Sequence, residues 1–360
     1  MAQRLPSYDG RGNSEAYKNY RIEDRSFFAI IKREISPEAE KLGFSAQKIA
    51  KIHIVVNELV TNLLKFGEKN RELLWKTIYY NGQAGIEILT LDKGPGIRSI
   101  SQAMEDGFST SGTAGEGLGA IKRQSDYFDI YSQSGQGTVV LARFFAEDTE
   151  VIPQPFNFAA FSVARPGEKL CGDGYYLIYK PETQTFQLLL LDGLGHGEGA
   201  YEASQAAIAA YQQIKKDEPA EVLKTIHQEI KKTRGAVAMA LAYEAQDTTI
   251  SYCGVGNISG KMIAYNKTKH FSSFNGIVGH AMSSRINNQK IKWERGSQLL
   301  LHSDGLVSRS DPSKYTQLQN HDPAILAACL YRDYSRGNDD TTIIICKHPD
   351  TDGKASKGNY

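Results

Sequence analysis

The sequence predicts an α+β protein with two domains, and three observations support this fold class. Its 360 residues exceed what one hydrophobic core comfortably fills and suit two. Segments with apolar residues at helical spacing alternate with short strand-like runs along the chain. The acidic stretch 146–155 carries two prolines and separates a first part of about 145 residues from a second part with a different, more β-rich pattern.

The first part is expected to be a mixed sheet with helices. Apolar and charged positions at helical spacing predict a helix within residues 23–43, and Ser45 is a candidate N-cap for a second helix that runs to about Phe66. Strands are expected over 73–80, 86–91, 127–132 and 138–145, with Gly135 and Gly137 in the last hairpin turn. The Gly-, Ser- and Thr-rich segment 97–119 is expected to form a mobile loop that leads into a short helix over 118–124.

The second part is expected to be a two-layer β core with helices outside. Its strand-like runs are residues 186–191, 237–243, 249–253, 298–301 and 342–346, and its helical stretches lie near 199–216 and 219–233. The polar tail after Pro349 is expected to be disordered.

Composition restricts the classes of partner. The formal net charge of +1 gives no electrostatic reason to expect nucleic acid. The four cysteines are widely spaced, which favours buried free thiols in a reducing compartment. The first residues contain no apolar signal segment, and no window approaches the roughly 20 apolar residues of a membrane span. We therefore expect a cytoplasmic protein that binds neither nucleic acid nor membrane.

Acidic residues recur in the second part where apolar runs end. The run 188–191 ends at Asp192-Gly193, and the pattern returns at Asp304-Gly305 and, as a doubled acid, at Asp339-Asp340. A buried strand that ends in a carboxylate holds that group at a sheet edge. Several such ends brought together form an oxygen-rich pocket that suits Mg²⁺ or Mn²⁺ and not zinc. A lone Asp-Gly is more often a turn, so the repetition carries the prediction.

A second set of polar residues lies on the helix that ends near Phe66. Helical rotation places Ile52, Val56, Leu59 and Leu63 on one stripe and Glu58, Asn62 and Lys65 on another. An acid, an amide and an amine in a row are the groups that position a hydroxyl, ligate Mg²⁺ and meet phosphate. A solvated helix face is the alternative for this helix taken alone.

Two glycine boxes follow this helix. Asp92-Lys-Gly-Pro-Gly-Ile97 comes after a strand, and Gly115-Glu-Gly-Leu-Gly119 opens a helix. Glycines at such junctions let backbone amides approach phosphate oxygens. A tight turn explains either box alone, whereas their order behind Glu58 and Asn62 is more specific.

With these motifs, residues 45–145 resemble the GHKL ATP-binding fold, most closely the anti-sigma-factor-type serine kinases and the stressosome switch kinases. The resemblance implies that Glu58 activates the substrate hydroxyl, that Asn62 holds Mg²⁺ and that Asp92 accepts the adenine amino group. Its glycine boxes match Gly94, Gly96, Gly115, Gly117 and Gly119. Lys65 is more similar to the phosphate-side lysine of histidine kinases, which leaves its role open. A histidine kinase is disfavoured because little chain precedes Glu58 and the nearby His53 lies in the same helix.

Residues 156–348 resemble the PPM-type metal-dependent serine/threonine phosphatases of the sporulation stage II protein E family. The matching motifs are Cys171-Gly-Asp-Gly174, Asp192-Gly193, Ser303-Asp-Gly305 and Asp339-Asp-Thr-Thr342. The family uses two Mn²⁺ or Mg²⁺ ions that share a water nucleophile. The resemblance implies that Asp192 bridges both ions, that Gly193 adds its carbonyl, and that Asp173, Asp304 and Asp339 complete the set. Asp340 is the alternative to Asp339, and the roles of His196 and Arg165 stay open.

The expected architecture is a GHKL α/β sandwich over 1–146, a linker over 147–155, a PPM-type αββα sandwich over 156–348 and a disordered tail over 349–360. The expected function is a bifunctional partner-switching regulator. Its first domain, with ATP and Mg²⁺, phosphorylates Ser or Thr on a STAS-type anti-sigma-factor antagonist, and its second domain removes the phosphate. The alternatives are a phosphatase whose ATP-binding domain only senses nucleotide or binds the partner, and a non-catalytic binding module.

Overall fold

The computed structural model describes residues 16–80, 83–104, 117–147, 157–180, 183–264 and 267–348. The central part of the expected loop 97–119, the linker after residue 147 and the expected disordered tail lie outside these ranges.

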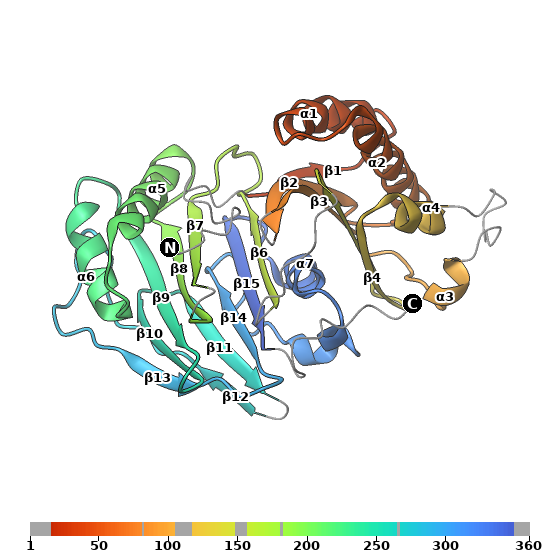
Figure 1. Ribbon diagram of the computed structural model, residues 1–360. Coiled ribbons are helices and arrows are strands. Elements are labelled where there is room, and N and C mark those ends of the chain that lie inside the picture. The colour runs from red at the N-terminus through yellow and green to blue at the C-terminus, as the bar shows by residue number, and fades with distance from the viewer. Residues whose placement is uncertain are drawn as a thin grey trace. The chain divides into compact units, whose positions relative to one another are not determined.

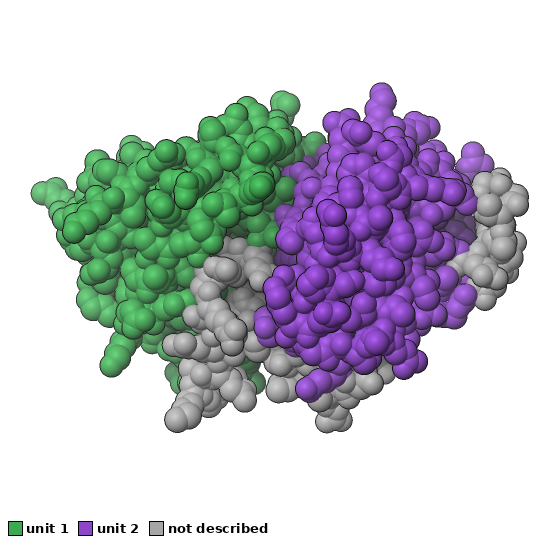
Figure 2. Space-filling view, turned by 90° about the horizontal axis from the view of Figure 1, so that it is seen from above, with its two compact units in different colours: residues 1–16, 153–311, 333–355 green, residues 17–152, 312–332, 356–360 purple. Residues whose placement is uncertain are grey.

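The chain divides into two compact units, which Figure 2 colours separately. Unit 2 contains Tyr17–Ile152 together with Pro312–Arg332, and unit 1 contains Pro153–Asp311 together with Asp333–Ala355. The boundary near residue 152 falls in the predicted linker. The segment Pro312–Arg332, by contrast, lies within the sequence range that resembles a phosphatase but packs in unit 2.

Unit 2 contains one five-stranded antiparallel sheet in the order β1-β2-β3-β5-β4. The strands are β1 (Lys18–Arg21), β2 (Glu72–Tyr80), β3 (Gln83–Leu91), β4 (Tyr127–Gln133) and β5 (Gly137–Phe145). The four strands expected in this part are confirmed, and β1 is an additional strand that the sequence analysis did not predict. Asp92 follows β3 directly, so the sheet fixes where this acid emerges.

Helices pack on this sheet through apolar side chains: α1 (Phe27–Lys41), α2 (Ala46–Phe66), the short α3 (Ile100–Ala103) and α4 (Gly117–Gln124) (Figure 1). The predicted N-cap is confirmed, because the Ser45 hydroxyl accepts a hydrogen bond from the Lys48 amide at 3.2 Å. The predicted buried stripe of α2 is confirmed as well, since Ile52, Val56, Leu59 and Leu63 are all buried. Glu58, Asn62 and Lys65 lie on a separate stripe of α2, as the sequence predicts.

Unit 1 is built on two five-stranded sheets in the orders β13-β10-β9-β8-β7 and β12-β11-β14-β15-β6. The first sheet contains β7 (Asp173–Lys180), β8 (Thr185–Gly193), β9 (Ala236–Glu244), β10 (Thr249–Val255) and β13 (Gln289–Lys292). The second contains β6 (Asn157–Val163), β11 (Ser259–Ala264), β12 (Lys267–His270), β14 (Gln298–His302) and β15 (Thr341–Lys347).

The two sheets of unit 1 share one apolar core. Leu188 and Leu190 of β8 face it from the first sheet, and Leu301 and Ile344 face it from the second. The alternate residues Leu189 and Leu191 of β8 pack instead against α5 (Glu198–Gln213) and α6 (Pro219–Glu229) on the outer face of the first sheet (Figure 1). The period-2 alternation of a strand with both faces covered explains why residues 188–191 are all leucine. The two-domain α+β class is confirmed.

The segment Pro312–Arg332 contains two short 3₁₀ turns, η2 (Pro312–Lys314) and η3 (Leu318–Asn320), and most of α7 (Pro323–Tyr334). Buried polar contacts hold it within unit 2. Arg143 of β5 donates from Nη1 to Asp322 Oδ2 at 2.6 Å and from Nη2 to Asp322 Oδ1 at 3.0 Å. On the neighbouring strand, Asp129 binds His321 Nδ1 at 2.9 Å and the Asp322 amide at 2.8 Å.

Within the described ranges, no helix combines the length and the apolar character needed to cross a membrane.

Two candidate catalytic sites

The first candidate site lies where strands of unit 1 end in carboxylates. Asp173 opens β7 and is paired in register with Asp192, the penultimate residue of β8. Burial raises the pKa of Asp173 well above its usual range, and the Asp192 carboxylate raises it further. Neighbouring strands therefore deliver two of the predicted acids to one end of the sheet.

The other predicted acids lie close enough to Asp192 to affect its pKa. Burial raises the pKa of Asp192 to about 7, and the nearby charges of Asp304, Asp339 and Asp340 contribute. The structure thus brings Asp173, Asp192, Asp304 and Asp339 into one electrostatic neighbourhood. Gly193 ends β8, and its amide donates to the Gly172 carbonyl at 3.2 Å.

These oxygen donors fit a hard divalent cation, because positive charge would offset the repulsion that raises the pKa of Asp192. Among the residues that the structure describes, however, no group of three or more His, Cys, Asp or Glu side chains has the arrangement of a formed metal centre. The carboxylates are gathered without being in coordination geometry.

Neighbouring polar side chains orient two of these acids. The Ser303 hydroxyl donates to Asp173 Oδ2 at 2.6 Å and accepts from the Thr342 amide at 2.9 Å. The Asn257 amide donates to Asp304 Oδ2 at 2.7 Å. The sequence analysis did not identify Ser303 or Asn257 as site residues, although Ser303 lies in the quoted Ser-Asp-Gly motif.

The two adjacent acids, Asp339 and Asp340, have different surroundings. The Asp340 carboxylate accepts backbone hydrogen bonds from Arg165 at 2.8 Å and from Gly172 at 2.9 Å, and it is 3% exposed. Both of its oxygens are therefore used to tie the 165–172 loop to β15. Asp339 is half-buried and accepts a hydrogen bond from the Asp340 amide at 3.0 Å. The Asp339 carboxylate therefore stays the better candidate for the predicted metal ligand, while the Asp340 carboxylate holds the loop.

The two residues whose roles were left open lie at the edge of this site. His196 is exposed, and its Nδ1 lies 2.9 Å from Glu168 Oε1. Arg165 is half-buried, and the hydrogen bond that ties it to Asp340 comes from its backbone amide. His196 also lowers the pKa of Asp340 electrostatically, which places its ring near the acids.

The second candidate site lies in unit 2, where α2 meets the start of α4. Glu58 and Asn62 are both half-buried on a stripe of α2 that flanks its apolar face. A Cβ at Gly117 would lie 3.3 Å from Asn62 Oδ1 and 3.5 Å from Glu58 Oε2. The second glycine box thus begins α4 directly against the acid and the amide. Lys65 is exposed near the end of α2, Gly119 is buried in α4, and Gly115 lies outside the described residues.

Asp92 is held firmly by backbone contacts. It is 9% exposed, its Oδ1 accepts from the Gly94 amide at 2.7 Å, and its own amide donates to the Thr138 carbonyl at 3.1 Å. Burial raises the pKa of Asp92, whereas backbone hydrogen bonds from Gly94 and Thr138 and the charge of Arg332 lower it. A Cβ at Gly137 would lie 2.0 Å from the Asp92 carbonyl, so this turn accepts only glycine.

Close packing also explains the first glycine box. A Cβ at Gly94 would lie 2.3 Å from the Phe66 carbonyl, and a Cβ at Gly96 would lie 2.3 Å from the Gln133 carbonyl. Both positions therefore need glycine for folding alone. Their nucleotide-binding role stays a prediction, which rests on their place directly after Asp92 in the sequence.

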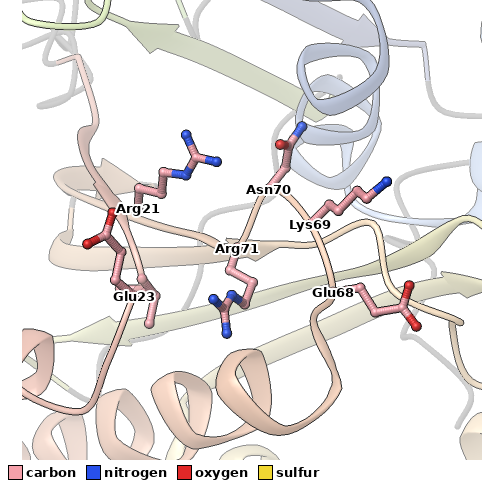
Figure 3. Close-up of a pocket in the computed structure, with 7 residues that line it drawn as sticks. Arg21, Glu23, Glu68, Lys69, Asn70 and Arg71 are labelled. Carbon is pink, nitrogen blue, oxygen red and sulfur yellow. The ribbon is translucent and has the colours of Figure 1, made fainter.

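A pocket of about 340 Å³ in unit 2 is lined by Arg21, Ile22, Glu23, Glu68, Lys69, Asn70 and Arg71 (Figure 3). The Lys93 amide donates to the Lys69 carbonyl at 2.9 Å, which ties the lining loop to the segment that follows Asp92. The pocket is lined by both positively and negatively charged side chains, and none of its lining residues is a predicted site residue.

Family models match both halves of the chain. Residues 29–144 match the histidine kinase-like ATPase domain, and residues 182–349 match stage II sporulation protein E.

Individual proteins are similar to each half. The serine/threonine-protein kinase RsbT of Bacillus subtilis (strain 168) is 38% identical over 104 residues, which cover 29% of this chain and 77% of RsbT. The phosphoserine phosphatase RsbX of the same strain is 24% identical over 148 residues, which cover 41% of this chain and 72% of RsbX. A chain from a structural study of the bacterial stressosome aligns with a TM-score of 0.50 at 26% identity, over 53% of this chain and 99% of that one.

Proposed function

Since the chain belongs to the anti-sigma-factor-type serine kinases related to RsbT, fused to a PPM-type phosphatase domain of the stage II sporulation protein E family, we propose that it is a bifunctional partner-switching regulator. Its first half phosphorylates, and its second half dephosphorylates, a serine or threonine of a STAS-type anti-sigma-factor antagonist. The observation that carries the proposal is the presence of two separate acid-centred sites in one chain. Added phosphate changes the charge of a partner surface and can make or break an interface. The cytoplasmic location expected from the sequence stays a prediction.

The phosphatase half is proposed to hold two Mn²⁺ or Mg²⁺ ions through Asp173, Asp192, the Gly193 carbonyl, Asp304 and Asp339. When bound, such ions lower the pKa of a water and neutralise phosphate charge. Ser303 and Asn257 keep the Asp173 and Asp304 carboxylates in place by hydrogen bonds. Outer hydrogen bonds of this kind orient ligands and usually alter metal affinity when they are lost.

The kinase half is proposed to bind ATP with Mg²⁺. Asp92 would accept the adenine amino group, and Asn62 would hold the ion through its amide oxygen. Glu58 would accept the proton of the substrate hydroxyl, in reach of the α4 start that Gly117 brings against it. Gly94, Gly96, Gly115, Gly117, Gly119 and Lys65 are proposed to line the nucleotide.

The test uses the full-length protein, a purified STAS protein and γ-labelled ATP. The Asp192→Asn variant should accumulate labelled partner, because phosphate transfer continues while its removal stops. Glu58→Gln should give no labelled partner yet should still release phosphate from a partner that was phosphorylated beforehand. Label that never appears with Asp192→Asn, under conditions where ATP binds, would remove the kinase claim. Release that continues unchanged in Asp192→Asn would remove the phosphatase claim.

A further inference from the structure

Arg332 is a charged residue that the two proposed activities do not use, although it is only 6% exposed. It is the last residue of the segment Pro312–Arg332 and lies in α7. Its Nη1 donates to the backbone carbonyl of Asp92 at 3.4 Å. A buried guanidinium loses its hydration and needs hydrogen-bond acceptors or a negative charge nearby. The Asp92 carbonyl and carboxylate provide both for Arg332.

The same guanidinium acts on the Asp92 side chain. Burial favours the protonated acid, and the positive charge of Arg332 favours the carboxylate. A protonated Asp92 would offer fewer acceptor positions to an amino group. Arg332 therefore works on both the backbone and the charge of the proposed adenine ligand.

The rest of the segment keeps Arg332 in this place. The Tyr331 hydroxyl accepts from Asn19 Nδ2 at 3.3 Å and lies 3.4 Å from Glu72 Oε2. Directly before α7, Asp322 is bound by Arg143. Contacts immediately before α7 and near its end therefore fix its position in unit 2.

We propose that Arg332, supplied by the half of the chain that matches stage II sporulation protein E, is a positioning residue of the nucleotide site in the other half. It holds Asp92 in the geometry and charge state that recognise the adenine amino group. The proposal rests on the proposed ATP-binding function. The match to the ATPase family ends at residue 144, so this contribution belongs to this chain and lies outside the matched ATPase domain.

Base selectivity gives a readout that a merely structural residue would not change. Inosine triphosphate has a carbonyl oxygen where ATP has the amino group, so an ionised, well-placed Asp92 should reject it. Affinities of full-length wild type, Arg332→Gln, Arg332→Lys and Asp92→Asn for ATP and inosine triphosphate, each with Mg²⁺, would be measured by calorimetric titration. Arg25→Gln is the matched control, because Arg25 is exposed in the same unit.

We expect Arg332→Gln to bind ATP roughly tenfold more weakly than wild type and to lose most of the preference for ATP over inosine triphosphate. Arg332→Lys should keep most of the preference, and Arg25→Gln should keep all of it. Two results would overturn the inference while leaving ATP binding intact: an unchanged preference in Arg332→Gln, or an equal loss of affinity for both nucleotides. If wild type itself binds neither nucleotide, the proposed kinase function fails first.

Discussion

Replacing Asp322 with alanine should destabilise unit 2 selectively. The Asp322 carboxylate receives two hydrogen bonds from Arg143, at 2.6 and 3.0 Å, and the two side chains are 8% and 4% exposed. Arg143 would keep one buried partner, because its Nε donates to Glu87 Oε2 at 2.5 Å.

The size of the effect follows from this burial. Removing one member of a buried ion pair typically costs about 3–5 kcal/mol because the remaining charge stays desolvated. Glu87 still neutralises Arg143, so we expect the lower end, about 3 kcal/mol, off the free energy of unfolding of unit 2. With a urea dependence of roughly 1–3 kcal/mol per molar, the unfolding midpoint should fall by about 1 M or more.

The chain provides a separate reporter for each unit. It has two tryptophans, Trp75 in the core of unit 2 and Trp293 in the core of unit 1, and each is 1% exposed. In a Trp293→Phe background, fluorescence follows unit 2, and in a Trp75→Phe background it follows unit 1. Asp322→Ala is compared with its own background in each case.

The control is Glu38→Ala, which removes an exposed ion pair with Lys41 in the same unit. Exposed pairs contribute about 0–1 kcal/mol, so this variant should barely shift the Trp75 midpoint. An unchanged Trp75 midpoint in Asp322→Ala, or an equal shift of the Trp293 midpoint, would refute the assignment of this segment to unit 2.

Two further predictions concern unit 1. Ser303→Ala removes the hydrogen bond that orients Asp173. The Mn²⁺ concentration for half-maximal phosphatase activity should therefore rise about 10–100-fold. The control is Ser272→Ala, which replaces an exposed serine and should leave this concentration unchanged. His302 is 2% exposed, and burial lowers its pKa from 6.5 to about 4; its contribution to stability is therefore fully present above about pH 6.5 and is lost as the pH falls towards 4. Urea midpoints between pH 4 and 7 should show a shallower loss in His302→Gln than in wild type, and parallel curves would contradict the assignment.

Local patterns predicted much of the fold. The Ser45 cap depends on residues within one turn, the apolar stripe of α2 repeats over about three turns, and both were confirmed by the structure. The apolar run 188–191 predicted a buried strand, and the structure shows that both faces of this strand are covered. The acids at strand ends were also predicted, since chain direction alone places them at a sheet edge.

Contacts between residues far apart in the chain could not be predicted from the sequence pattern. The helix α7 is buried on nearly all sides, from Pro323 to Leu330, so its residues carry no amphipathic period that would predict a helix or show what covers it. The pair of Arg143 with Asp322 joins residues 179 positions apart, and neither residue type indicates its partner. The doubled acid at 339–340 was ambiguous for a similar reason, because only the backbone contacts of the 165–172 loop distinguish its members.

The placement of Pro312–Arg332 affects how this protein can be dissected. A fragment ending near residue 152 would contain every motif of the ATPase family and yet would expose Arg143 and Asp129 where Asp322 and His321 normally bind. Weak nucleotide binding by such a fragment would reflect a missing piece of scaffold, and it would say nothing about catalytic competence. Swapping halves between homologues raises the same difficulty, because the graft must carry these 21 residues along with the domain they support.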